Sequence, residues 1–319
     1  MKLTLGPVLF NWQPAKWRDF YFRIADEAPI DAVAIGEVVC SKRIPLLAAH
    51  MPEVIDRLAR AGKEVLLASL ALVTQARERR LTVELAEVEQ ITVEANDISC
   101  LAHLAGKPHA IGPFINVYNE ATAEFFAMRG AQRICLPPEL PASSIQAIAK
   151  AIPAVIVEVF AFGRMPLAIS ARCYHARLHG LSKDNCHFVC ENDPDGLAVD
   201  TLDGESILAI NGVQTLSHGT ANLIGDLTDL AAMGVRACRL SPHSGDMVAV
   251  TTLFRAVLDG HLDPKEAHAR LALIHPQACH ANGFLHGRPG ADWVGRLSSP
   301  QSAEGAAHQG DAHPLVQSG

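Results

Sequence analysis

Hydrophobic positions in this 319-residue chain form short runs, and longer amphipathic segments separate them. Short apolar runs between turn residues predict buried strands, and apolar residues three and four apart predict helices. The runs that predict strands are residues 3–10, 32–38, 63–70, 90–95, 109–117, 133–136, 154–160 and 237–240. The segments that predict helices are residues 14–27, 45–61, 74–88, 97–105, 120–129, 143–151, 222–233 and 246–258. Eight strands alternating with helices predict an α/β fold, a TIM-type (β/α)8 barrel of parallel strands.

This alternation is interrupted after the seventh predicted strand. Residues 161–203 form a polar, cysteine-bearing insertion, and residues 207–217 return as extended chain with Asn211-Gly212 as a turn. We expect a single barrel domain over residues 1–297, including the insertion, and a disordered tail over residues 298–319. An open doubly wound sheet is the alternative, but the sequence lacks both G-x-x-x-x-G-K-[ST] and G-x-G-x-x-G.

Three cysteines of the insertion, Cys173, Cys186 and Cys190, lie where no strand or helix core requires a small buried residue. A fourth, Cys40, follows the second predicted strand, just as the insertion follows the seventh. Both places are at the carboxyl ends of barrel strands, the end at which barrel active sites lie. Four converging thiolates suit zinc or an iron–sulfur cluster. The C-x12-C-x3-C spacing lacks the paired C-x2-C of common zinc sites, which favours a cluster and leaves zinc as the alternative.

The other cysteines call for a different interpretation. Cys100, Cys135 and Cys238 lie in or beside apolar runs, so we expect buried, chemically inert thiols. Cys279, in H-P-Q-A-C-H-A-N-G, has no assigned role.

The composition and charge of the chain argue against some classes of function. The chain is 49% hydrophobic and 19% charged, as in ordinary globular proteins, and its net charge of −7 disfavours nonspecific nucleic-acid binding. The first residues, M-K-L-T-L-G-P, lack a signal-peptide cleavage site, and no apolar run reaches the ~20 residues of a membrane span. We therefore expect a cytoplasmic protein without a transmembrane segment, whose clustered cysteines bind metal rather than form disulfides.

Catalytic residues are not assigned, because neither H-E-x-x-H nor G-x-S-x-G occurs. Glu37 and Glu158 lie at or near predicted strand ends on the expected active face, where each could be an acid/base group or a structural hydrogen-bond partner. Arg164 could bind a carboxylate or form a surface ion pair.

Five histidines fall in or near the same loops. His175, His179 and His187 interleave with the cysteines and could hydrogen-bond cluster sulfurs or be solvated, and we expect them to be solvated. His218 and His243, near predicted barrel-end loops, are candidate site residues.

One stretch resembles a family signature. Residues 157–173, V-E-V-F-A-F-G-R-M-P-L-A-I-S-A-R-C, resemble the collagenase-like U-type peptidase signature, which runs Glu-x-Phe-x-x-Gly and continues to a cysteine. Here these positions are Glu158, Phe160, Gly163 and Cys173, and Pro166 stands where family members often have another cysteine. The resemblance extends from L-G-P-V-L-F-N-W through I-G-E-V-V-C-S-K-R to N-G-F-L-H-G-R-P-G.

Within that family the chain is similar to the ubiquinone-biosynthesis members, which take the missing ligand from the N-terminal half. The resemblance thus implies a [4Fe-4S] cluster on Cys40, Cys173, Cys186 and Cys190. It implies a heterodimer with a UbiU-like protein, a subunit of a complex for O2-independent (anaerobic) hydroxylation. Ubiquinone intermediates are then the substrates and prephenate the candidate oxygen donor. The alternatives are a zinc-dependent hydrolase or peptidase on the same barrel, and a noncatalytic partner subunit stabilised by its cluster.

Overall fold

A closed barrel of eight parallel strands is the framework of the computed structural model, which describes residues 1–276 and 278–294. Strand β11, the last of the barrel strands in chain order, pairs with both β1 and β7, so the ring closes without a free edge. In order around the ring, the strands are β11 (Ala237–Leu240), β1 (Lys2–Leu5), β2 (Ala32–Ile35), β3 (Glu64–Ala68), β4 (Thr92–Ala95), β5 (His109–Ile111), β6 (Ala131–Leu136) and β7 (Ile156–Ile169). The predicted TIM-type barrel is confirmed, and the predicted tail, residues 298–319, lies outside the described residues.

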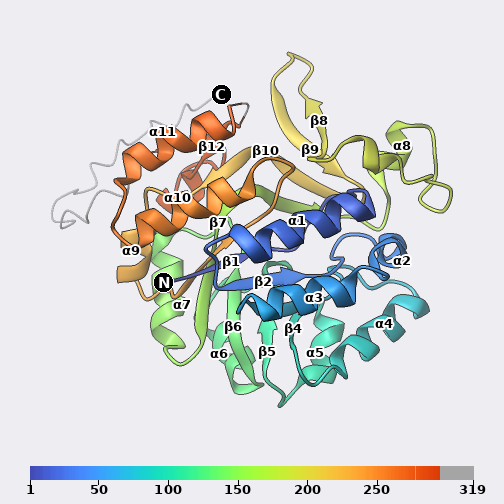
Figure 1. The fold of residues 1–319 in the computed structure, drawn as a ribbon, viewed down its shortest axis with the longest axis horizontal. Coiled ribbons are helices and arrows are strands. Elements are labelled where there is room, and N and C mark those ends of the chain that lie inside the picture. The colour runs from blue at the N-terminus through green and yellow to red at the C-terminus, as the bar shows by residue number, and fades with distance from the viewer. Residues whose placement is uncertain (277, 295–319) are drawn as a thin grey trace, which may run out of the picture.

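Helices cover the outer face of the barrel (Figure 1). They are α1 (Pro14–Glu27), α3 (Met51–Arg60), α4 (Ala76–Ala86), α5 (Ile98–Leu104), α6 (Glu120–Met128), α7 (Ala142–Ala151), α9 (Leu227–Ala232), α10 (Met247–Leu258) and α11 (Pro264–Ile274). Helix α1 shows how the sequence produces this layer. Pro14 lies in its first turn, where a backbone N–H would have no partner within the helix. One face of the helix packs against the strands and is buried there, with Trp17, Tyr21 and Ile24.

Several strands end earlier than predicted, and a following proline explains the early end of two of these strands. Strand β1 ends at Leu5, just before Gly6 and Pro7, and β5 ends at Ile111, shortly before Pro113. Proline has no N–H to donate to a neighbouring strand. The chain beyond these ends forms the loops at the carboxyl end of the barrel.

Strand β7 is longer than predicted, because it leaves the barrel and continues in a second, antiparallel layer. Its later residues pair with β10 (Gln214–Asn222), which also pairs with β9 (Ser206–Asn211) and β12 (His280–Ala281), while β8 (Leu197–Asp200) extends β9. Gly163 permits the change of direction, since its φ is +119° and a Cβ there would lie 2.6 Å from the Ser241 Cβ. The predicted Asn211-Gly212 turn joins β9 to β10. The helix predicted at 222–233 begins later, at Leu227, because β10 runs to Asn222.

The barrel interior holds a buried ion network around Glu158. The Glu158 carboxylate accepts hydrogen bonds from Thr4 Oγ1 at 2.7 Å and Arg133 Nη1 at 2.8 Å, and Arg239 bridges Glu158 to Glu94. Burial by itself would raise the pKa of Glu158, but the Arg239 and Arg133 guanidiniums outweigh it and lower the pKa to about 2.

Glu158 therefore lies in the frame of the barrel, and the expectation that it sits at a strand end on the active face is wrong. It is the third residue of β7, fully enclosed, and its carboxylate is committed to two arginines. Of its two predicted roles, structural hydrogen-bond partner is the one that this geometry supports.

Candidate metal centre

Two segments that are far apart in the sequence meet at the carboxyl end of β2. The first follows β2 and contains the 3-10 turn η1 (Ser41–Arg43) and the short helix α2 (Ile44–Leu47). The second is the insertion, with helix α8 (Tyr174–Leu178) and the 3-10 turn η3 (Val189–Asn192). Figure 1 shows the α8 segment beside the α2 segment.

The four cysteines selected from the sequence, Cys40, Cys173, Cys186 and Cys190, all line one small pocket between these segments. The cavity between these side chains has a volume of about 20 Å³. Cys173 and Cys190 are buried, whereas Cys40 and Cys186 are half-buried. The structure thus brings together the whole predicted ligand set; that these residues bind a metal stays a prediction.

Glu37 holds the backbone that carries Cys40. Its buried carboxylate accepts the N–H groups of Val39 at 2.8 Å and Cys40 at 2.9 Å. Burial raises the pKa of Glu37, and the Arg43 guanidinium, 3.9 Å away, acts in the opposite direction. Glu37 is thus a positioning residue, the structural one of its two predicted roles.

Replacing Glu37 tests that positioning. We expect Glu37→Ala to lower the free energy of unfolding by at least about 1–3 kcal/mol, because the Val39 N–H is left buried without an acceptor. Glu37→Gln is the matched control, since its amide oxygen can still accept both N–H groups. Urea unfolding measures both variants. An equal loss in the two variants would show that the charge opposite Arg43, rather than the acceptor, is what the site needs.

Positive charge surrounds the pocket. The buried Arg43 donates to the Leu9 carbonyl and to Asn211 Oδ1, both at 2.9 Å, and its guanidinium also contacts the Cys190 side chain. Within the residues that the structure describes, Arg43 Nε has no hydrogen-bond partner. Lys42 Nζ lies 3.7 Å from the Cys186 Sγ, and Lys183 lines the same pocket. Cations beside thiols favour the thiolate form, which is the form that binds metal. Sequence reasoning missed this feature, although two cations, Lys42 and Arg43, come within three residues after Cys40.

Burial has the opposite effect on the thiols themselves. It raises the pKa of Cys40 and of Cys173, and the Arg43 charge only partly offsets this. Since a metal binds thiolates, loading the pocket would release protons.

The thiols are spread around the pocket. In the part of the chain that the structure describes, no three of these sulfur atoms lie within 4.8 Å of one another. Tetrahedral zinc with Zn–S bonds of about 2.3 Å needs sulfur atoms about 3.8 Å apart. A four-iron cluster binds each thiolate at a different iron, so the thiolates stand farther apart. The four-thiol donor set and the neighbouring cations therefore fit an iron–sulfur cluster.

The expectation that the interleaved histidines are solvated is wrong for His175. His179 and His187 are exposed, but His175 is fully buried and its Nε2 lies 2.9 Å from Asp193 Oδ2. The rings of His175 and His179 are nearly parallel, with centroids 5.7 Å apart. The His175–Asp193 contact joins α8, which follows Cys173, to the chain just after Cys190. It therefore holds the two ends of the cysteine loop together.

Arg164 and the other two predicted histidines do not line the cysteine pocket. Arg164 lies within β7, and its Nη1 donates to the carbonyls of Ser217 and His218, so it is not a free carboxylate-binding group. His243 is buried, its Nδ1 accepts the Gly245 N–H at 2.9 Å, and burial lowers its pKa to about 4, which leaves it neutral at pH 7. His218 is half-buried, and burial lowers its pKa as well.

The remaining cysteines separate clearly from the pocket. Cys100, Cys135 and Cys238 are fully buried, as predicted, and burial raises the pKa of each thiol. Cys279 is exposed.

Within residues 1–276 and 278–294, no helix is long and apolar enough to cross a membrane.

Comparison with known proteins identifies the family of this chain. The model of peptidase family U32 matches residues 20–295. Among solved structures, the U32 peptidase Mk0906 is 14% identical, with a TM-score of 0.44, over 76% of this chain and 94% of that one. N-acetylneuraminate lyase from Fusobacterium nucleatum, solved with pyruvate, is 9% identical, with a TM-score of 0.45, over 86% of this chain and 81% of that one. Because the family model spans most of the sequence, this chain belongs to peptidase family U32.

Proposed function

We propose that this chain is an iron–sulfur protein in which Cys40, Cys173, Cys186 and Cys190 hold a [4Fe-4S] cluster. One observation carries the proposal: four thiols from two distant segments line a single pocket flanked by cations. A cluster with four thiolates carries net negative charge. Arg43, Lys42 and Lys183 supply the compensating positive charge, and Arg43 Nε, which has no hydrogen-bond partner among the described residues, offers a further N–H.

The ligand set limits what such a cluster can do. With a cysteine on every iron, no iron is open to substrate, so the cluster would carry electrons or stabilise the fold. The chain's own residues would set its behaviour. Lys42 and Arg43 place positive charge beside the thiolates, which stabilises the more negative, reduced state, and the buried position of Cys173 and Cys190 limits access of water.

The biological role that we propose is O2-independent hydroxylation in ubiquinone biosynthesis. In this proposal the chain is a UbiV-like member of the family and acts as a heterodimer with a UbiU-like partner, on ubiquinone intermediates, with prephenate as candidate oxygen donor. Two features support it: membership of family U32, and a pocket in which Cys40, from the N-terminal half, joins the three cysteines of the insertion, while Pro166 of β7 stands where family members often have a cysteine.

Metal analysis of anaerobically purified protein tests the cofactor. We expect about four iron and four acid-labile sulfide per chain, and an EPR signal on reduction. Stoichiometric zinc, or no metal under strict anaerobic handling, would overturn the proposal; zinc together with peptide cleavage would favour a hydrolase.

A second experiment tests the biological role. The cluster-bearing chain and a UbiU-like partner are mixed anaerobically with a ubiquinone precursor and prephenate. Product formation supports the role, and a complex that forms but makes no product points to a noncatalytic subunit.

A further inference from the structure

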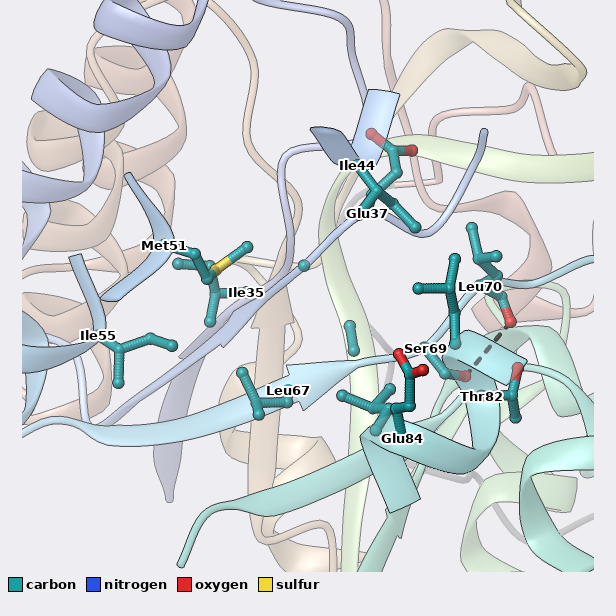
Figure 2. A pocket seen from close by; sticks show the side chains of 14 residues that line it. Ile35, Glu37, Ile44, Met51, Ile55, Leu67, Ser69, Leu70, Thr82 and Glu84 are labelled. Carbon is teal, nitrogen blue, oxygen red and sulfur yellow. Dashed lines mark hydrogen bonds between the residues drawn. The ribbon is translucent and has the colours of Figure 1, made fainter. Parts of the chain in front are cut away.

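A second and larger pocket opens in the wall of the barrel, next to the segment that carries Cys40. Its cavity volume is about 360 Å³. Helix α3 packs on α1, and α4 packs on α5. The pocket lies between these two pairs, with Met51 and Ile55 of α3 on one side and Leu81 and Leu85 of α4 on the other. The strands β2 and β3 form its floor, as Figure 2 shows for Ile35 and Leu67.

The walls of this pocket are aliphatic side chains that the protein leaves half-buried. They are Ile44, Met51, Ile55, Leu67, Leu81 and Leu85. Single apolar residues on a surface need no explanation, but a contiguous set gathered in a hollow marks a binding site. The volume lies in the range of small-molecule pockets, which are mostly apolar with few polar groups.

Polar groups around the pocket are few, and most already have partners. Ser69 Oγ donates to the Leu70 carbonyl, Thr82 Oγ1 donates to the Glu78 carbonyl at 2.9 Å, and the Glu37 carboxylate binds backbone N–H groups. Among the lining residues, the charged ones are Glu37 and Glu84. Figure 2 shows the Glu84 carboxylate beside the aliphatic walls. Such a lining selects an uncharged, apolar ligand and repels an anionic one.

We propose that this pocket binds an uncharged isoprenoid chain. Branched aliphatic walls suit the branched, flexible isoprene unit, and a chain longer than the pocket can leave through its open side between α3 and α4. The binding of an uncharged isoprenoid follows from the pocket alone. The identity of the natural ligand as the prenyl tail of a ubiquinone precursor rests on the proposed function.

The location gives this site a link to the cysteine pocket. Glu37 lines the apolar pocket and at the same time holds the Cys40 N–H, and Ile44 lines it directly after Arg43. One short segment, residues 37–44, therefore contributes to both pockets. A ligand bound in the barrel wall would therefore contact the same segment that carries Cys40.

Calorimetric titration of the purified chain with farnesol, which has three isoprene units and no charge, tests the site. We expect saturable binding, and about tenfold or more weaker binding of farnesyl diphosphate, since that ligand has the same chain but an anionic end. Leu81→Trp, which fills the pocket, should weaken farnesol binding by about tenfold or more. Leu273→Trp is the matched control, because Leu273 is 81% exposed on α11, and it should leave binding unchanged.

Each outcome decides the matter. Absence of saturable binding by the wild type would overturn the proposal, and would point to a protein side chain as the natural occupant. Equal binding by Leu81→Trp and wild type, or tighter binding of the diphosphate, would overturn it too. Urea unfolding, compared with the wild type, shows whether Leu81→Trp is folded. Iron content, measured on the same samples, separates the two proposals: farnesol binding by protein without iron would support this site while the cluster fails.

Discussion

Cys40→Ser is expected to abolish the iron–sulfur content of the protein. Iron should fall from about four atoms per chain to less than about one, with parallel loss of sulfide and of visible absorbance. Cys40 is the one proposed ligand outside the insertion, and a serine hydroxyl is a poor substitute because it does not ionise near neutral pH. The measurement is iron and sulfide analysis of anaerobically purified protein, normalised to chain concentration.

Two cysteines of this chain serve as matched controls for that substitution. Cys279 is exposed and Cys100 is fully buried, and neither lines the cysteine pocket. Cys279→Ser should change nothing. Cys100→Ser should lower stability, because it buries a hydroxyl, but should retain the iron. Full iron in Cys40→Ser, or loss of iron in Cys279→Ser, would refute the ligand set.

The second large effect is expected from Arg239→Met, which should lower the free energy of unfolding by about 3–5 kcal/mol. Arg239 bridges Glu94 and Glu158, and its removal leaves two buried carboxylates short of a cation. Urea unfolding at pH 7 measures the loss. Arg270→Met is the control: among the described residues Arg270 pairs with Glu266 alone, on the surface of α11, so its loss should change stability little. Similar losses in the two variants would mean that the network contributes no more than a surface ion pair.

Acid should reveal the same network in the unmodified protein. The folded-state pKa of Glu158, about 2, is below its usual 4.5, so its ionised form stabilises the fold above about pH 4.5. That contribution is lost as the pH falls from about 4.5 towards 2. In Arg239→Met the pKa of Glu158 rises, so the part of the acid sensitivity that comes from Glu158 should shrink. If Arg239→Met does not fold, Arg239→Lys, which keeps the charge, supplies the comparison.

Short apolar runs were enough to predict the barrel, because each buried strand of a parallel sheet needs apolar residues on both faces. The eighth run, residues 237–240, coincides with β11, which closes the ring. The sequence also predicted that Cys40 and the insertion lie at the same end of the barrel, since all parallel strands end on one face. Because β1 and β11 separate β2 from β7 in the ring, the meeting of the four cysteines in one pocket also depends on how the insertion folds.

Other features depend on contacts that no local pattern records. The sequence around Glu158 does not show whether its carboxylate faces a substrate or two arginines. Only the tertiary structure, which places Arg133 and Arg239 beside it, shows that Glu158 belongs to the ion network. Burial of His175 depends on Asp193, and the place of Arg43 depends on Asn211, both distant in sequence. The length of β7 was set by its pairing with β10. The apolar pocket exists because α3 and α4 pack on different neighbours, and a periodic pattern shows which face of a helix is apolar but not what covers it.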